Sequence, residues 1–234
     1  MRVLGLIPAR AGSKGVPRKN LRLLAGKPLL QYSVESAVGA GRLARVVVST
    51  ESGEIAAVAR DAGAEVPFVR PPGLAADDTP MLPVVAHALR TLEEQGDAYD
   101  AVCLLQPTCP LRRSQDIDGC IEMLDRTGAD SVVTVLEVPA RYHPHWTFLQ
   151  NGDGSLQPAT GAPLVPRRQE LAPAFHRDGS IYVTRRSVVL DGNSLYGHRM
   201  LGYRTDPEWN VNIDDLDDWA PATSRKALFK HSLP

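Results

Sequence analysis

This chain of 234 residues contains few aromatic residues and few cysteines, and its positive and negative charges nearly balance. Aromatics make up 6% of it, and its formal net charge is -1 at pH 7. This balance excludes a global attraction to nucleic acid or to an anionic membrane surface. No apolar run approaches the roughly 18 residues that a membrane-spanning helix needs, and the N-terminal one is too short for a signal peptide. We therefore expect a cytoplasmic protein without a nucleic-acid or membrane partner.

The three cysteines exclude a disulfide framework, because their number is odd and their spacing matches no metal-binding motif. Cys103 falls in an apolar strand-like run and Cys120 on the apolar face of a predicted helix, so both are interpreted as buried hydrophobic residues. Cys109 lies in a loop, but no activating base is evident for a nucleophilic thiol. The two histidines of the HPH stretch, His143 and His145, have no third ligand nearby in the sequence that would favour a metal site.

What the chain does contain is enough apolar sequence, 43% of its residues, to bury the core of one globular domain. Through the first 138 residues, apolar strand-like runs alternate with helical patterns, which predicts an α/β fold with a mainly parallel sheet between helices on both faces. The predicted strands are 3–7, 45–50, 66–70, 101–106 and 131–138, followed later by 179–186 and 208–214.

Helices are predicted between these strands from apolar residues at helical spacing. One covers 30–38 and ends near Gly39, and a second starts at Thr79 and Pro80. A third is capped by Ser114, and a closing helix covers 214–229. Asp77 and Asp78 precede the second helix and are interpreted as favourable charges at its N-terminus. His87 lies among the apolar positions of that helix and is interpreted as an interior histidine whose hydrogen bonds are satisfied.

Residues 139–174 break the alternating pattern, since prolines and glycines become frequent and neither the strand nor the helix period holds. A segment of this length within a compact domain is usually functional or an interface arm. We therefore interpret 1–234 as a single domain that carries 139–174 as an arm.

The stretch IPARAGSKGVPRKN, residues 7–20, follows the first predicted strand and carries four basic side chains and no acidic one. Ligands of open parallel sheets bind at the carboxyl ends of the strands, where this loop lies. It matches neither the dinucleotide fingerprint nor the Walker loop. Gly12 and Gly15 would let backbone amides approach an anion, while Arg10 and Lys14 supply the charge for a polyphosphate.

The same stretch resembles the N-terminal signature of the acylneuraminate cytidylyltransferases, the CMP-sialic acid synthetase family. Four further stretches resemble that family in order: RPPGLAADDTPM, LLQPTCPLR, PRRQELAPAFHRDGSIYVTRR and VNIDDLDDW. The resemblance implies a Rossmann-like nucleotidyltransferase three-layer sandwich and a homodimer in which 139–174 is an arm for dimerisation and acceptor binding. It also implies an enzyme that uses Mg2+ and CTP, in which an oxygen of a small acidic acceptor attacks the α-phosphorus and pyrophosphate leaves.

The resemblance assigns roles to individual residues of this chain. The implied nucleotide-binding residues are Ala9, Arg10, Gly12, Ser13, Lys14, Asn20, Arg70 and Thr79. The implied acceptor-binding residues are Gln106, Arg168, His176 and Tyr182, with Arg168 directed at the acid group. Arg10, Lys14 and Asp214 would be catalytic, and Asn212 and Asp214 would hold the metal.

Several positions depart from the family pattern. Asn212 stands where an Asp is usual, which keeps an oxygen ligand but removes a negative charge and leaves Asp215 or Asp217 as alternative ligands. Trp146, Leu195 and Tyr196 alter acceptor positions, so we expect an acid other than N-acetylneuraminate, such as legionaminic or pseudaminic acid. The alternatives are a 3-deoxy-octulosonate or a phosphonate acceptor, a uridylyl- or guanylyltransferase that makes nucleotide sugars, and a non-catalytic regulator that binds nucleotide or sugar.

Overall fold

A mixed β-sheet forms the centre of the computed structural model, which describes residues 1–13 and 15–230, with side chains as far as residue 225. Lys14 therefore lies outside the described residues. The described part holds a six-stranded sheet in the order β10-β6-β9-β5-β1-β4, in which β9 runs antiparallel to both of its neighbours while the other pairs are parallel. The strands are β1 (Val3–Pro8), β4 (Arg45–Ser49), β5 (Ala101–Leu105), β6 (Ser131–Glu137), β9 (Phe175–Arg185) and β10 (Met200–Arg204).

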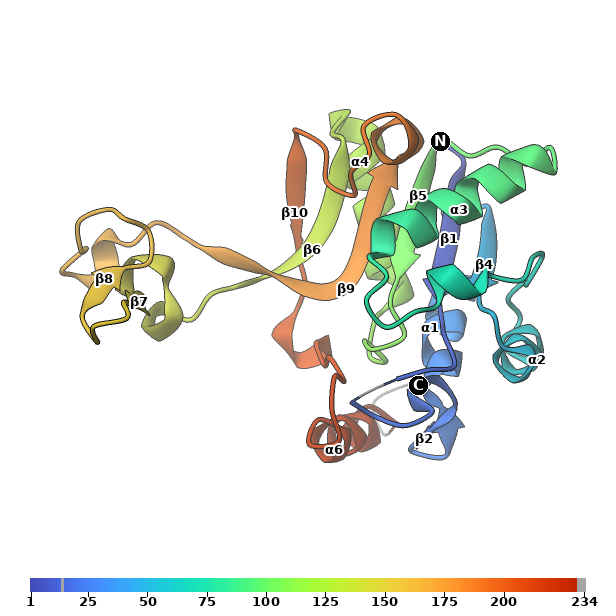
Figure 1. Ribbon diagram of the computed structural model, residues 1–234, viewed down its shortest axis with the longest axis horizontal. Coiled ribbons are helices and arrows are strands. Elements are labelled where there is room, and N and C mark those ends of the chain that lie inside the picture. The colour runs from blue at the N-terminus through green and yellow to red at the C-terminus, as the bar shows by residue number, and fades with distance from the viewer. Residues whose placement is uncertain (14, 231–234) are drawn as a thin grey trace.

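Helices cover both faces of this sheet and complete a three-layer α/β sandwich (Figure 1). The helices α1 (Leu29–Val38), α2 (Gly53–Asp61) and α4 (Ser114–Thr127) bury their apolar sides against one face. The helices α3 (Met81–Glu94) and α5 (Arg186–Leu190) pack on the other. No helix among the described residues is long and apolar enough to cross a membrane.

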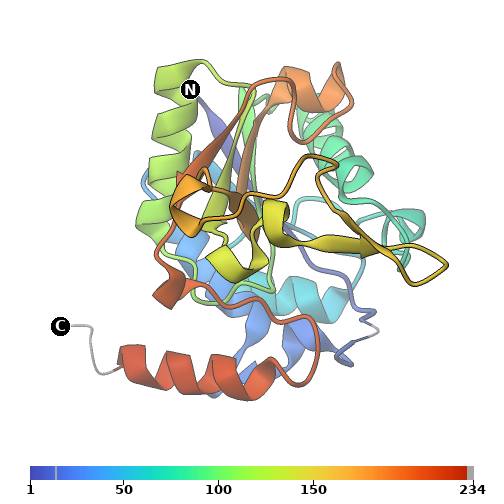
Figure 2. The ribbon, with the colours of Figure 1, turned by 90° about the vertical axis from the view of Figure 1, so that its left-hand side faces the viewer.

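A smaller apolar cluster attaches the C-terminal part of the chain to its N-terminal part. Helix α6 (Trp219–Lys230) lies across the base of the molecule (Figure 2), near the hairpin of β2 (Leu23–Leu24) and β3 (Lys27–Pro28). Leu24, Ile213 and Ala222 are buried together in this cluster. The packing places residues 211–218 beside the loop that follows β1.

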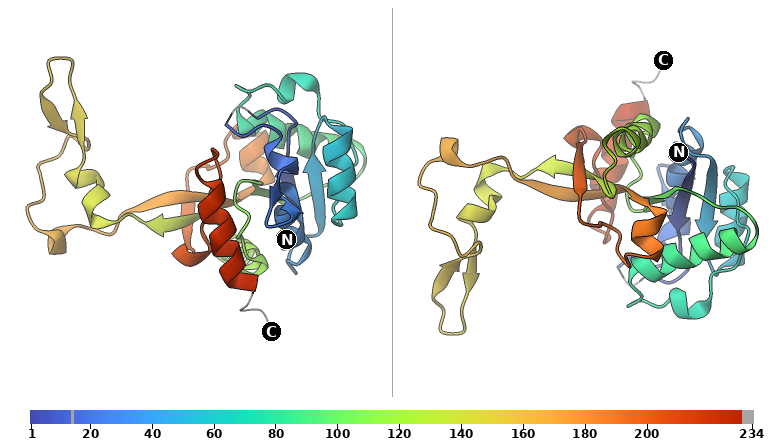
Figure 3. Two further views of the ribbon diagram at one scale, coloured as in Figure 1. Left: turned by 90° about the horizontal axis from the view of Figure 1, so that it is seen from below. Right: turned by 90° about the horizontal axis from the view of Figure 1, so that it is seen from above.

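Residues 139–174 leave the sandwich as an arm, because β6 and β9 continue outward as a paired ribbon (Figure 3). The arm ends in a hairpin of β7 (Phe148–Gln150) and β8 (Leu156–Pro158). His143 Nε2 lies 2.9 Å from the Ala172 carbonyl, and the Trp146 indole donates to the Val165 carbonyl at 2.6 Å. His143 also accepts from the His145 amide, so this histidine serves the internal structure of the arm.

Most predicted elements are confirmed, including the end of α1 at Gly39, but three predictions were wrong. Residues 66–70 form no strand, because Pro67 interrupts the segment and only Glu65 bridges to Val47 of β4. Residues 208–214 are a turn followed by irregular chain, and the last strand of the sheet is β10, which was not predicted. The closing helix begins five residues later than predicted, because the Asp218 carboxylate accepts from the amides of Asp214 and Asp215 and holds them in a turn.

Two interpretations of polar residues near helices also need correction. Ser114 does not cap α4, since its hydroxyl donates to the Ser36 carbonyl at 2.8 Å and thereby joins α4 to α1. His87 is only partly satisfied, since among the described residues its buried Nδ1 has no hydrogen-bond partner. Its ring lies edge-on to Phe68, at 5.3 Å between centroids. Cys103 and Cys120 are fully buried, as predicted.

Candidate active site

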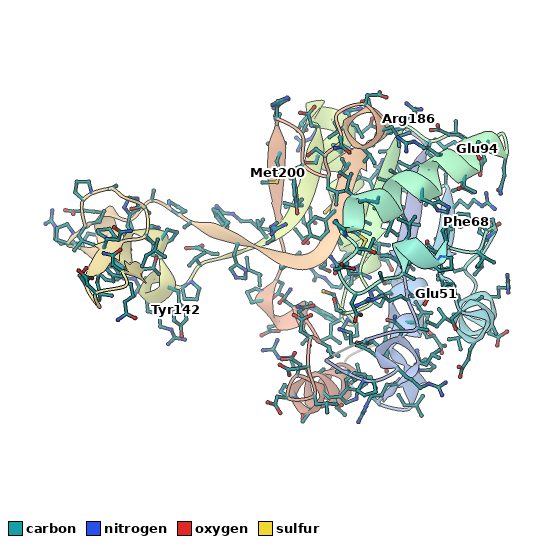
Figure 4. All side chains as sticks on the ribbon, in the orientation of Figure 1. Glu51, Phe68, Glu94, Tyr142, Arg186 and Met200 are labelled. Carbon is teal, nitrogen blue, oxygen red and sulfur yellow. The ribbon has the colours of Figure 1, made fainter. Side chains whose placement is uncertain are left out.

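The loop after β1 is held in place by hydrogen bonds to its backbone. The Ala9 amide donates to the last residue of β4 at 3.0 Å, which extends the sheet into the loop. The Ala11 amide donates to Glu51 Oε1 at 2.6 Å, and Glu51 lies just beyond β4 (Figure 4). The Asn20 amide group donates to the Arg10 carbonyl at 2.8 Å and so joins the two ends of the loop. Between the hydrogen-bonded residues Ala11 and Asn20, Gly12 is exposed and Ser13 is half-buried.

The acidic segment 211–218 lies directly against this loop. A Cβ at Gly15 would collide with the Asp214 carbonyl, so only glycine permits this approach. The Lys19 ammonium donates to the Ile213 carbonyl at 3.0 Å, and the Ile213 amide donates to the Thr108 carbonyl at 2.9 Å. Burial lowers the pKa of Lys19, while the Asp214 charge opposes this shift. Three segments that are distant in the sequence therefore meet at the carboxyl ends of β1 and β5.

Asn212 and Asp214 place their side chains together. The Asn212 amide donates to Asp214 Oδ2 at 2.5 Å, and its carbonyl oxygen lies 3.7 Å from the Cys109 sulfur. Among the described residues, Asp214 Oδ1 has no hydrogen-bond partner. Magnesium is commonly held in proteins by one or two carboxylates together with phosphate oxygens. The described residues contain no group of three His, Cys, Asp or Glu that could hold a metal. One carboxylate and one amide oxygen are hard donors, and they fit magnesium bound together with a triphosphate.

Arg70 is buried at the end of β4, with only 3% of its surface exposed. Its guanidinium donates to the Ser49 hydroxyl at 3.1 Å and to the Ser49 carbonyl. Burial lowers the pKa of Arg70 to about 10, with Glu51 acting in the opposite direction. The side chain therefore remains a cation at neutral pH, in a position where its charge is weakly screened.

Arg10 joins the basic loop to the segment that precedes α3. Its guanidinium lies 2.6 Å from Asp77 Oδ1 and 3.4 Å from the Ala75 carbonyl. Asp77 thus pairs with Arg10, and no side chain caps the N-terminus of α3, which corrects the interpretation of Asp77 as a helix-capping charge. The Thr79 hydroxyl donates to the Gly73 carbonyl and closes this segment on itself.

Arg112 is a buried cation that the assignment of site residues missed. Its guanidinium donates to the Ser180 carbonyl at 2.9 Å, to the Ser33 hydroxyl at 3.1 Å and to the Gln106 carbonyl at 2.6 Å. Burial lowers its pKa. Arg112 therefore fixes the end of β5, where Gln106 lies. The sequence did contain a signal for this residue, because Arg112 is the last residue of LLQPTCPLR, one of the stretches that resemble the family.

Cys109 is buried beside this group, and burial raises the pKa of its thiol to about 11. The thiol is therefore protonated at neutral pH, which argues against a nucleophilic role. The absence of an identifiable base in the sequence pointed to the same conclusion.

The predicted acceptor residues fall into two groups. Gln106 directly follows β5, and Tyr182 is buried in the adjacent strand β9, where its ring lies 6.4 Å from that of Tyr196. Burial raises the pKa of Tyr182. His176 is exposed where the arm leaves the sheet, and Arg168 is exposed on the arm itself. The structure thus places Gln106 just after β5 and Tyr182 in the neighbouring strand β9, while Arg168 projects away from them with the arm.

A twisted, mainly parallel sheet with a basic loop, a buried arginine and an acidic segment at its carboxyl edge defines a nucleotide-binding α/β protein of the nucleotidyltransferase class. Residues 4–187 match the family model described as cytidylyltransferase, and the chain belongs to this family of CTP-dependent nucleotidyltransferases. The family prediction is confirmed.

Three curated relatives illustrate the range of the family. The chain is 36% identical to a CMP-N,N'-diacetyllegionaminic acid synthase of Legionella pneumophila, with 100% of both chains covered. It is 34% identical to a pseudaminic acid cytidylyltransferase of Campylobacter jejuni, over 84% of each chain. It is 33% identical to N-acylneuraminate cytidylyltransferase A of Danio rerio, over 97% of this chain and 51% of that protein. The chain thus spans about half the length of the fish relative.

Solved structures share the fold at lower identity. A CMP:2-keto-3-deoxy-manno-octonic acid synthetase complexed with CTP superposes with a TM-score of 0.71 at 19% identity, and 100% of both chains is covered. A 4-diphosphocytidyl-2C-methyl-D-erythritol synthase from Anaerococcus prevotii gives a TM-score of 0.69 at 11% identity, over 97% of this chain and 96% of that one. The predicted α/β sandwich is confirmed.

Proposed function

We propose that this protein transfers CMP from CTP to a nonulosonic sugar acid and releases pyrophosphate. The observation that carries the proposal is the convergence of the basic loop, Arg70 and the segment 211–218 at one edge of the sheet. The similarity to the Legionella pneumophila synthase along the whole chain supports an acceptor of the legionaminic type.

The basic loop would bind the triphosphate. Arg10 offers a planar guanidinium that can bind two phosphate oxygens at once, and Gly12 leaves room for the backbone to approach them. Lys14, outside the described residues, remains a predicted second cation. Arg70 would contact the cytidine from the end of β4. Transfer of this kind depends mainly on positioning and on neutralising the charge of the departing pyrophosphate, so no covalent enzyme intermediate is required.

Asp214 would hold magnesium together with the carbonyl oxygen of Asn212, once the Asn212 amide is turned so that its oxygen faces Asp214 in place of its nitrogen, because both are hard oxygen ligands next to the phosphate-binding loop. A bound magnesium ion would supply charge neutralisation on the phosphate oxygens. Gly15 keeps this pair close to the loop. Lys19 in turn fixes the backbone of Ile213 and so orients the segment that carries both ligands.

We also propose that the arm mediates homodimerisation and carries Arg168 toward the acceptor site of a second copy. Large apolar side chains are exposed on the arm, with Tyr142 at 60%, Leu156 at 62% and Leu149 at 54%. Such side chains on a projecting segment are typical of an interaction surface. Deletion of residues 139–174 should convert a dimer to a monomer in sedimentation experiments. A deletion variant that still sediments with the mass of two chains would oppose this proposal.

The function is tested by pyrophosphate release with CTP, UTP and GTP against a panel of acids. The panel comprises legionaminic, pseudaminic and N-acetylneuraminic acids, a 3-deoxy-octulosonate and a phosphonate. We expect turnover with CTP and magnesium, with a nonulosonic acid other than N-acetylneuraminate as the best acceptor. Better turnover with UTP or GTP would overturn the choice of nucleotide. CTP binding without release of pyrophosphate from any acid would indicate a regulator instead of an enzyme.

A further inference from the structure

A cavity of about 370 Å3 opens on the face of the sheet formed by β6, β9 and β10. Val133 and Val135 form its apolar floor, and Gly202 contributes no side chain there. Arg177 and Arg204 complete its lining with two positive charges. Met200, labelled in Figure 4, marks its β10 side. The cavity therefore combines an apolar surface with two guanidinium groups.

Strand register places the two arginines symmetrically. Val135 of β6 is paired with Arg177 of β9 on one side and with Arg204 of β10 on the other. Directly paired residues on neighbouring strands project from the same face of a sheet. Adjacent strands lie about 4.8 Å apart, so the two arginines flank the Val135 side chain from strands roughly 10 Å apart.

Neither arginine is neutralised by a carboxylate of residues 1–13 or 15–225. Among the described residues, no carboxylate lies within ion-pair distance of Arg177 or Arg204, whereas Arg186 is held by both oxygens of Glu93. Arg177 donates to the Tyr196 hydroxyl, with its guanidinium 5.2 Å from that ring centroid. Arg204 lies 4.4 Å from the centroid of the Phe175 ring. Aromatic contacts orient both groups, and most of the five N–H donors of each remain available for a ligand.

A buried carboxylate fixes the backbone beside both arginines. Asp178, which follows Arg177, accepts from the Thr134 hydroxyl of β6 and from the Ser180 amide. Its other oxygen accepts from Thr205, which follows Arg204, at 2.7 Å. Because one carboxylate contacts β6, β9 and the residue that follows β10, the core of the protein fixes the spacing between the backbones of the two arginines.

Contacts of Asp178, the residue after Arg177, lead from the strand beside the cavity to the candidate active site. The Asp178 carbonyl accepts from Asn210 at 3.3 Å and lies 4.0 Å from the Cys109 sulfur. Cys109 in turn contacts Asn212 of the segment proposed to hold magnesium. Burial raises the pKa of Tyr182, the predicted acceptor residue in the same strand, and the positive charge of Arg177 opposes this rise. Arg177 donates to Tyr196, whose ring lies 6.4 Å from that of Tyr182, so a molecule in this cavity would lie near this predicted acceptor residue.

We propose that Arg177 and Arg204 bind the carboxylate of the acceptor, and that the apolar floor receives an acyl or alkyl part of the same molecule. Two guanidiniums about one anion match the oxygens of a carboxylate through paired hydrogen bonds. The inference rests on the proposed function. It assigns recognition of the acid group to the chain that binds CTP, in addition to any contribution from Arg168 on the arm.

The test compares Arg177→Ala, Arg204→Ala and Arg177→Lys with a matched control, Arg126→Ala, an exposed arginine on α4. Steady-state kinetics with the best acid of the panel give the KM of the acceptor, and calorimetry gives the Kd of CTP. Loss of a hydrogen bond to a charged group weakens binding by about ten- to a hundredfold. We expect that increase in the acceptor KM for both alanine variants, a smaller one for Arg177→Lys, and no change in the Kd of CTP.

The carboxamide of the same acceptor, used as a competitive inhibitor, separates charge recognition from general damage. Its inhibition constant should rise far less than the acceptor KM in both alanine variants, because a neutral amide loses only a hydrogen bond where the carboxylate loses a charged partner. An unchanged acceptor KM in both alanine variants would overturn the inference while leaving the proposed function intact. A native protein that releases no pyrophosphate with any acid would overturn the proposed function itself.

Discussion

The guanidinium of Arg10 and the carboxylate of Asp77 lie 2.6 Å apart, and this pair joins the phosphate-binding loop to the segment before α3. An anionic side chain thus contacts the cation that we assign to the triphosphate. The two anions compete for one guanidinium, so binding of CTP must replace or rearrange this contact.

Replacement of Asp77 by Asn should therefore strengthen CTP binding. Both side chains are partly exposed, so the pair contributes at most about 1 kcal/mol, and the Kd of CTP should fall by about two- to fivefold. Calorimetric titration measures this change. Asp78→Asn, which alters the exposed neighbouring residue, is the control and should bind CTP as the native protein does. Weaker binding by the Asp77 variant would mean that Asp77 helps to hold the nucleotide.

Replacement of Arg10 by Ala should have the opposite and larger effect. Removal of one preorganised donor from a transition state costs about 2 to 4 kcal/mol, so kcat/KM should fall by about 30- to 1000-fold. Initial rates of pyrophosphate release over a range of CTP concentrations give this value. Near-native turnover would show that Arg10 does not contact the transferred group.

Gly15→Ala tests the contact between the loop and the acidic segment. The added methyl group would collide with the Asp214 carbonyl and displace a proposed magnesium ligand. Misplacement of a reacting group by about 1 Å can cost a hundredfold in rate, and we expect a loss of that order in kcat/KM. Gly53→Ala on α2 is the matched control, because no atom lies within 4 Å of the position that its Cβ would occupy and Gly53 has no proposed role in the site. Equal activity of the two variants would exclude a role for this approach.

Asn212→Asp should increase the affinity for magnesium. The substitution restores a carboxylate beside Asp214, and added ligand charge strengthens the binding of a divalent cation. The magnesium concentration that gives half-maximal activity should fall by about five- to tenfold. Asp215→Asn, which removes a nearby charge outside the proposed ligand pair, separates this effect from the total charge of the segment. A higher magnesium requirement in Asn212→Asp would argue against Asn212 as a ligand.

Cys103 should make stability depend on pH in the alkaline range. Burial in β5 raises the pKa of its thiol from an ordinary value of 9.0 to about 12 in the folded protein. The folded state therefore keeps a proton that the unfolded state loses, so the contribution of this thiol is full below pH 9 and is lost as the pH rises toward 12. Denaturant unfolding should show a smaller decrease in stability over this range for Cys103→Ala than for the native protein. If the free energy of unfolding fell equally with pH in the two proteins, the raised pKa of Cys103 would be contradicted.

The sequence alone determined the elements whose signals are local. Apolar runs that alternate with helical patterns predicted β1, β4, β5 and β6, because these strands bury most of their side chains between two layers. The family motifs led to the correct family, and the position of the basic loop after the first strand predicted a nucleotide site at that edge of the sheet. Residues 66–70 had an apolar composition typical of a strand, yet Pro67 and their place at the edge of the sheet prevented regular pairing.

Tertiary structure alone decided which distant residues meet. No local pattern shows that Gly15 contacts Asp214, or that Arg112 reaches the Gln106 carbonyl, because these contacts depend on how the elements pack. The pairing of Arg177 and Arg204 about Val135 requires β9 to insert antiparallel between β5 and β6, with β10 on the far side of β6. That order is set by long-range strand pairing, in which side-chain burial across the whole sheet selects the register.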